Sequence, residues 1–383
     1  MLRFLTAGES HGPGLVAVVE GLPAGLEVTA EALAAELARR RRGHGRGRRM
    51  TVEKDQLEIL GGVRFGRTLG GPVAVVVRNS EWPRWQETMA PGPGGEGVAA
   101  LVTPRPGHAD LAGMMKYDTH DARDVLERAS ARETAARAIA GALAGNLLGT
   151  AGVSVVSHVV AIGPVMGGGP APEPGDRARV DLSPVRCLDP GAEAAMVAEI
   201  DRARRERDTL GGVVEILAYG VPAGVGSHVH WDRRLDAALA GALMSIPGIK
   251  GVEIGDGFAA AVRRGTEAHD TIGYSDAGFV RETARAGGIE GGMSTGQVIR
   301  LRAAMKPLST LGRPAPSVAV TTKRPGAALR QRSDTCAVPA AGVVAEQMVA
   351  WVLAAEMVRM FGGDTVSDFT GAVEAYRRRL AGF

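Results

Sequence analysis

Residues 117–149 read YDTHDARDVLERASARETAARAIAGALAGNLLG, a polar run that continues into an alanine-rich tail. From Asp124 onward the stretch consists mainly of strong helix formers, and its apolar residues recur at roughly helical spacing. The sequence therefore predicts one central helix from Asp124 through the tail, whose small side chains allow other elements to approach closely. We expect the rest of the chain to be organised around this helix.

The first turns of this helix carry more polar chemistry than packing alone requires, namely Arg128, Ser130, Arg132 and Glu133. One interpretation is a solvated helix face with ion pairs four residues apart, for example between Glu127 and its neighbours. The other is an anion site near a helix start, where backbone N–H groups and arginines face a phosphate. Nothing inside the stretch decides between the two.

Length and composition indicate a globular enzyme. The 383 residues are 45% hydrophobic and 23% charged, which excludes a disordered chain. We find no apolar run of membrane-spanning length and no apolar signal-peptide core in residues 1–12, so the expected location is the cytoplasm. Two isolated cysteines are too few for a disulfide framework or a paired zinc site. The net charge is only +3, but nearly all the positive charge is arginine, which suits planar oxyanions.

Strand and helix patterns alternate along the chain. Strands are predicted at residues 15–20, 72–77, 153–162, 213–219, 297–303 and 318–322. Helices are predicted at residues 30–42, 192–208, 232–244, 341–360 and 366–380. Residues 79–97 and 163–190 are expected to be loops, and residues 248–296 are too glycine-rich to assign. This pattern favours an α/β or α+β fold, and because no clean linker divides it, we expect a single domain over residues 1–383.

Two histidines lie in turns where they could contact a ligand. Ser10 and His11 belong to a glycine-rich turn before the strand at 15–20, and His108 lies between Pro106 and Asp110. Histidine supplies a proton donor or acceptor at neutral pH. A lone histidine is nevertheless more often structural or on the surface, so neither motif identifies a catalytic site by itself.

An arginine-rich segment holds seven arginines in residues 39–49, interrupted by three glycines. Runs of this kind are usually solvated or bind nucleic acid nonspecifically. Nucleic-acid binding would favour stacking aromatics nearby, and the segment has none. The glycines favour a backbone that wraps closely around a compact anion. We find no Walker loop, no dinucleotide-binding glycine motif and no H-E-x-x-H zinc motif.

Two further candidates lie late in the chain. Lys306 to Leu311 reads KPLSTL, where a lysine beside hydroxyls suits a phosphate, and Arg332-Ser333-Asp334 pairs a base with an acid. Each motif is weak alone. Together with the earlier motifs they predict a large pocket for a polyanion.

The motifs as a set resemble the chorismate synthase family over essentially the full chain. They are GESHGPGL (8–15), RRRRGHGRGRRM (39–50), RPGHADL (105–111), RASARET (128–134), GGIEGGMSTG (287–296), KPLSTL (306–311) and RSDTC (332–336). The resemblance implies a β-α-β sandwich, usually a homotetramer, with helices between antiparallel or mixed sheets. It implies an FMN-dependent anti-1,4-elimination of phosphate from 5-enolpyruvylshikimate-3-phosphate to give chorismate, with no nucleic-acid or membrane partner.

The resemblance also implies roles for particular residues. His11 would protonate the departing phosphate or its surroundings, with Ser10 and Ser130 as catalytic neighbours. His108 would stabilise the reduced, charged flavin, and Asp334 would lie near the reactive flavin nitrogen. The expected substrate-binding residues are Arg40, Arg46, Arg49 and Arg132. The expected FMN-binding residues are Arg128, Ala129, Ser130, Pro247, Gly248, Gly291, Lys306, Pro307, Leu308, Ser309, Thr310 and Arg332.

Two positions depart from the family pattern. The family commonly has Tyr where this chain has His44, and Asn-Ala where it has Pro247-Gly248, so a flavin contact from the second segment would be made by main chain. Two other classes stay open from the residues alone: an arginine-rich RNA-binding protein and a flavodoxin-like FMN electron carrier. The sequence does not decide whether NADPH supplies the electrons for the flavin, since no nicotinamide-binding turn is recognisable.

Overall fold

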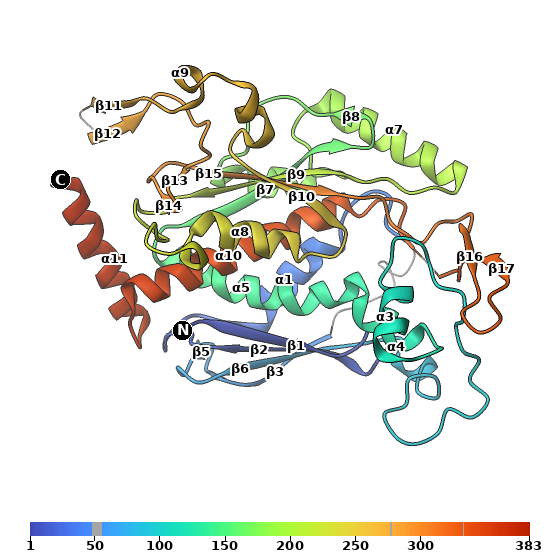
Figure 1. Cartoon of the computed structure of the whole chain (residues 1–383). Coiled ribbons are helices and arrows are strands. Elements are labelled where there is room, and N and C mark those ends of the chain that lie inside the picture. The colour runs from blue at the N-terminus through green and yellow to red at the C-terminus, as the bar shows by residue number, and fades with distance from the viewer. Residues whose placement is uncertain (48–55, 276–277, 332) are drawn as a thin grey trace.

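Two antiparallel sheets enclose a layer of helices (Figure 1). The computed structural model describes residues 1–47, 56–275, 278–331 and 333–383. The first sheet contains, in spatial order, β1 (Arg3–Ala7), β2 (Gly14–Glu20), β6 (Val73–Arg78) and β3 (Gln56–Gly61). The second contains β10 (Ile249–Ile254), β15 (Ile299–Met305), β9 (Gly212–Tyr219), β7 (Ser154–Ile162) and β8 (Val165–Met166). The predicted β-α-β sandwich is confirmed.

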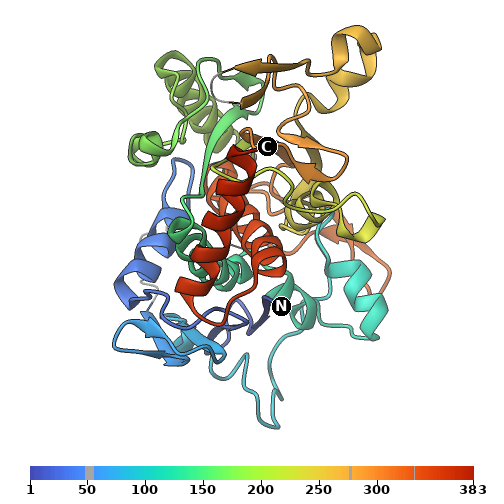
Figure 2. The ribbon, with the colours of Figure 1, turned by 90° about the vertical axis from the view of Figure 1, so that its left-hand side faces the viewer.

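The helices between the sheets are α1 (Ala30–Arg41), α5 (Thr134–Thr150), α8 (Leu235–Met244) and α10 (Val338–Phe361). Helix α5 packs on β2 of the first sheet, and α10 packs on β7 and β9 of the second. Figure 2 shows the same layers from the end that carries α11 (Val366–Ala381), with the red C-terminal helices between the blue strands and the green elements. One hydrophobic cluster contains buried residues from both sheets and from the helices between them.

Helices α5 and α10 meet where α5 has no side chain. A Cβ added to Gly141 would lie 2.3 Å from Cβ of Gln347 on α10, so only glycine permits this approach. The alanine-rich tail therefore has the packing role that the sequence predicts. Helix α10 does reach the length and apolarity of a membrane span, contrary to the expectation of no such run. However, 94% of its apolar window is buried, as in the core helix of a globular protein.

The predicted central helix is wrong in one respect, because it is interrupted at Ser130. Helix α4 (Arg123–Ala129) ends there, a short 3-10 helix follows at Ala131–Glu133, and α5 begins at Thr134. Ser130 is extended (φ −64°, ψ 139°), and its Oγ accepts a hydrogen bond from the main-chain N of Arg132 at 3.3 Å. Serine competes with the helix by bonding its own backbone in this way. The RASARET motif is thus a joint between two helices.

Most other predicted elements are present. The strands at 15–20, 72–77, 153–162 and 213–219 correspond to β2, β6, β7 and β9, and Thr29 caps α1 as its sequence indicates. Helix α7 (Pro190–Glu206) matches the prediction closely, whereas α8 begins three residues later than expected. The strand predicted at 297–303 is shifted by two residues to β15.

Several elements differ from the sequence prediction. Residues 319–322 are not in a strand, because β16 covers Pro316–Val318 and pairs with β17 (Pro325–Ala327) around a turn. The expected loop at 163–190 contains β8 and α6 (Arg177–Leu182), and α3 (Asp110–Tyr117) was not predicted. The unassigned region contains β10, a 3-10 helix (Gly257–Val262), α9 (Gly265–Ala268) and the hairpins β11–β12 (Ile272–Ser275, Gly278–Arg281) and β13–β14 (Ile289–Glu290, Met293–Ser294).

Candidate active site

His11 lies in a buried pair with Glu127. The turn after β1 brings its Nδ1 to 2.7 Å from Oε2 of Glu127 on α4, and the main-chain N of Ser10 donates to the Glu127 carbonyl at 3.0 Å. The imidazole also lies against Trp85, with ring centroids 4.0 Å apart. A carboxylate at one ring nitrogen orients the imidazole and fixes its tautomer. Glu127 is therefore a partner of His11, 116 residues away, rather than part of a solvated helix face.

His108 is partly buried and belongs to a second cluster, which is centred on the buried Asp110. Its Nδ1 is hydrogen-bonded to Asp110, whose other contacts come from Arg105: the main-chain N at 3.0 Å and Nε at 2.8 Å. Burial alone would raise the pKa of Asp110, but hydrogen bonds from His108 and Arg105 outweigh it and hold that pKa well below its ordinary value. Arg105 also donates through Nη1 to Oγ1 of Thr310 at 2.8 Å. The cluster thus connects RPGHADL to KPLSTL.

Asp334 is held by the arginine-rich segment. Its Oδ2 lies 2.6 Å from Nη1 of Arg46, and its Oδ1 accepts the main-chain N–H of Gly47 at 2.7 Å. Arg40 is buried and donates to Oγ1 of Thr134 at 3.3 Å, at the start of α5. These contacts bring three motifs to one end of the helical layer. The predicted site residues Arg49 and Arg332 lie outside the residues that the structure describes.

The residues of RASARET have different surroundings. Arg128 donates to the carbonyls of Gly8 and Thr6, at 3.0 and 2.9 Å, so it closes the turn that carries His11. Ala129 and Ser130 are partly buried beside it, and Arg132 is buried. The stretch therefore positions the His11 turn as well as starting α5.

The segment Lys306 to Thr310 follows β15 and is fixed by its neighbours. The main-chain N of Lys306 donates to the Gly248 carbonyl at 2.9 Å, and its Nζ donates to the Gly107 carbonyl at 2.8 Å. Burial, followed by the charge of Lys250, lowers the pKa of Lys306. Pro307 is exposed, whereas Leu308, Ser309 and Thr310 are partly buried. The main chain of Pro247-Gly248 is thus beside the lysine.

Gly291 is not near the other candidates. It lies in the turn of the β13–β14 hairpin, where Met293 forms a bridge with Gly226. The Gly226 carbonyl accepts from Arg359 in the last turns of α10, whereas Asp334 precedes the first turn. A helix of 24 residues is about 36 Å long, so the two ends are far apart. Figure 1 shows the hairpin and α3 at opposite ends of the molecule.

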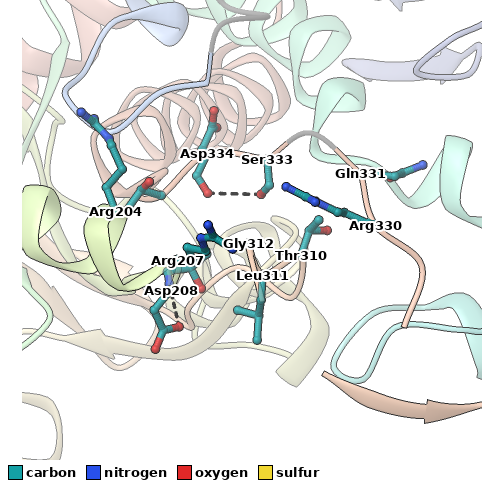
Figure 3. A pocket seen from close by; sticks show the side chains of 12 residues that line it. Arg204, Arg207, Asp208, Thr310, Leu311, Gly312, Arg330, Gln331, Ser333 and Asp334 are labelled. Carbon is teal, nitrogen blue, oxygen red and sulfur yellow. Dashed lines mark hydrogen bonds between the residues drawn. The ribbon is translucent and has the colours of Figure 1, made fainter. Parts of the chain in front are cut away.

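A cavity of about 680 Å³ opens beside Thr310 and Asp334 (Figure 3). Its other lining residues are Arg204, Arg207, Asp208, Thr209, Leu311, Gly312, Arg330, Gln331, Ser333 and Thr335. The three arginines among them belong to no sequence motif, because exposed arginines at a helix end or in a loop look like ordinary solvated charge. Thr209 was also not predicted, and its Oγ1 donates to the Leu308 carbonyl at 2.8 Å and so supports the KPLSTL segment.

A β-α-β sandwich with two histidine–carboxylate pairs at the same end as an arginine-lined cavity defines an enzyme that acts on a small anionic molecule. A family model described as chorismate synthase matches residues 2–358. The chain is 60% identical over 385 residues to a chorismate synthase of Acidothermus cellulolyticus and 59% identical over 386 residues to one of Thermobifida fusca, with 98% of each chain covered. A solved crystal structure of chorismate synthase superposes with a TM-score of 0.81 at 39% identity, covering 100% of this chain and 99% of that one.

The chain belongs to the chorismate synthase family, and it is therefore a lyase of the shikimate pathway. Membership in this family identifies the chain as the enzyme, rather than as the RNA-binding protein or the FMN electron carrier that the sequence also left open.

Proposed function

We propose that this protein eliminates phosphate from 5-enolpyruvylshikimate-3-phosphate to give chorismate, with reduced FMN as cofactor. The observation that carries the proposal is the position of His11–Glu127 and His108–Asp110 at one end of the helical layer, with an arginine-lined cavity beside Thr310. We also propose that residues 1–383 act as one domain in a cytoplasmic homotetramer, and that NADPH or an external reductant keeps the flavin reduced.

The residues of the cavity fit a flavin mononucleotide. Its volume of about 680 Å³ is within the usual range for small-molecule sites. Its arginines and hydroxyls are donors suited to a phosphate. Lys306 adds a further positive charge in the segment that contains Thr310. Lys306, Ser309, Thr310 and the main chain of Pro247-Gly248 would hold the cofactor. When bound, reduced FMN would supply the electron density that C–O cleavage requires.

Arginines would hold the substrate, which carries one phosphate and two carboxylates. Arg40 and Arg132 are buried near the start of α5, where a low dielectric strengthens their attraction for an anion. Arg46 is the third candidate, and its pairing with Asp334 keeps its guanidinium in place. Bidentate arginine forks match carboxylate and phosphate oxygens, so these side chains would orient the ring of the substrate.

The two histidines would have separate roles. His11 would donate a proton as the phosphate leaves, and Glu127 would keep the imidazole oriented. His108, held by Asp110 and Arg105, would lie beside the bound cofactor and stabilise its reduced form. Trp85 covers one face of the His11 ring and would exclude water from it.

The test is turnover of single-histidine variants, measured anaerobically with chemically reduced FMN. We expect His11→Ala and His108→Ala to lower turnover by about 10²–10⁴, the range for a positioned acid or base. His230→Ala is a matched control, because His230 also pairs with an aspartate, Asp232 at 2.9 Å, but is 61% exposed. Full activity of His11→Ala or of His108→Ala would remove the role of that histidine. Flavin binding without phosphate release would indicate an electron carrier instead.

A further inference from the structure

Two arginines converge on the cavity beside Thr310. Figure 3 shows the guanidinium groups of Arg207 and Arg330 directed toward the same space from different sides, whereas that of Arg204 points away from them. Within the described part of the chain, Arg207 and Arg330 make no ion pair with a carboxylate. Arg204, in contrast, lies 3.3 Å from Asp201.

The carboxylates that line the cavity do not neutralise these two arginines. Asp334 is already bound to Arg46 and to the main chain of Gly47. Asp208 accepts from the main-chain N of Thr209 at 2.7 Å, and Figure 3 shows its side chain directed away from Arg207. The cavity therefore presents two positive charges to whatever occupies it.

Arg207 is fixed in an unfavourable backbone conformation. It follows the last turn of α7 with φ +60° and ψ 37°, the left-handed region where glycine is the usual residue. The Arg207 carbonyl accepts from the main-chain N of Arg313 at 3.3 Å. A Cβ added to Gly312 would lie 2.9 Å from the Cβ of Arg207, so the two segments are in close contact. A strained residue that lines a cavity is a reason to look for function. The strain here holds an arginine against the loop that contains Thr310.

Arg330 is fixed by the residues on either side of it. The main-chain N of Leu329 donates to the Thr103 carbonyl at 3.1 Å. Oε1 of Gln331 accepts from Nη1 of Arg105 at 3.1 Å, the same nitrogen that donates to Thr310. The backbone that carries Arg330 is thus tied to the cluster around His108, across the cavity from Arg207.

Two guanidinium forks and a hydroxyl are the donor set for a phosphate monoester. Thr310 accepts from Arg105 through Oγ1, and within the described residues its hydroxyl proton has no protein acceptor, so it can donate to a ligand. We propose that Arg207 and Arg330 clamp the phosphate group of reduced FMN, with Thr310 as the third donor. This inference rests on the proposed function. The cofactor is the favoured source of the phosphate because Thr310, which lines the cavity, belongs to the proposed flavin segment.

The test compares a flavin that has the phosphate with one that lacks it. Reduced FMN and reduced riboflavin are titrated anaerobically by calorimetry into the full chain and into Arg207→Gln and Arg330→Gln. We expect each variant to bind reduced FMN about tenfold to a hundredfold more weakly, the loss for a hydrogen bond to a charged group, with riboflavin unchanged. Arg205→Gln is the matched control, since it removes the same charge from the same helix end but does not line the cavity.

The outcomes separate this clamp from the proposed function. If the variants bind FMN and riboflavin equally more weakly, or bind both as tightly as the wild type, the clamp is overturned. The proposed function as a flavin enzyme is unaffected by either result. Weaker binding of shikimate 3-phosphate with FMN unchanged assigns the arginines to the substrate and also overturns it. A wild-type chain that binds neither flavin overturns the proposed function together with the clamp.

Discussion

Replacing Asp110 by asparagine is expected to weaken a specific part of the fold. Asp110 is fully buried and receives the main-chain N, Nε and Nη2 of Arg105 at 3.0, 2.8 and 3.1 Å, as well as His108. The Arg105 side chain is only 5% exposed. Asparagine keeps the shape but removes the charge, so a buried guanidinium loses its counter-ion. This is the situation in which breaking an ion pair is costly.

The magnitude follows from two independent estimates. Two unit charges about 4 Å apart interact by about 4 kcal/mol at an effective dielectric constant of about 20. Removing one partner of a buried pair costs about 3–5 kcal/mol in measured cases. The loss should be local, because α3 and α4 pack around a small cluster of their own: Met114, Ala122, Val125 and Leu126. We therefore expect the free energy of opening residues 105–126 to fall by about 3–5 kcal/mol.

Hydrogen exchange measures this opening free energy, and pH provides a second test. Because the folded pKa of Asp110 lies below its unfolded value of about 3.9, its contribution is complete above that pH and is lost as pH falls further. Protection in the wild type should decrease below about pH 4, and Asp110→Asn should lose that part of the pH dependence.

Asp118→Asn is the control for the Asp110 experiment. Asp118 is exposed and has φ +52°, which asparagine tolerates, so we expect little change. The double variant Arg105→Met/Asp110→Asn should recover part of the loss, since both charges are then absent. A loss below about 1 kcal/mol for Asp110→Asn, or one no larger than for Asp118→Asn, would refute the reasoning.

Three other predictions follow from buried contacts. Gly141→Ala should destabilise the protein by at least about 2–3 kcal/mol, because the added Cβ would overlap Gln347. Gly145→Ala on the same helix has open space around the added Cβ and should stabilise the protein by up to about 1 kcal/mol. Urea denaturation of the two variants measures both changes in the free energy of unfolding. Thr209→Val leaves the Leu308 carbonyl without its donor and should raise the KM for the flavin more than it lowers kcat. Steady-state kinetics in which neither KM nor kcat changes would contradict this prediction. Cys336 is fully buried, and burial raises its pKa to about 11, so native protein at pH 8 should show no fast thiol reaction there.

The fold was predictable to the extent that local patterns determine it. Apolar strands and capped helices such as α1 appear in the sequence because periodicity and capping are short-range properties. The break at Ser130 was missed, although serine followed three residues later by Glu133 is a typical helix-start spacing. Helix propensity on both sides of Ser130 concealed it. Short elements such as α3 have too few residues for their periodicity to be recognised.

The site was predictable only where its chemistry is contained in a motif. His108 and Asp110 are two residues apart, so RPGHADL already contains that pair. Glu127 could not be identified as the partner of His11, because the contact depends on how α4 packs against the turn after β1. Arg207 and Arg330 belong to no motif, and only the tertiary structure brings them to one cavity.

The two histidine pairs also differ in how they depend on the fold. Asp110 and His108 lie on one short segment, so their contact is retained when α3 and α4 move as a unit. Glu127 is carried by α4, whereas His11 is anchored to the first sheet, so we expect opening of α3 and α4 to separate that pair. Arg128 at the end of α4 opposes the separation by donating to the carbonyls of Thr6 and Gly8. We therefore expect the His11–Glu127 contact to depend on the stability of the region formed by α3 and α4, which the exchange experiment on Asp110→Asn measures.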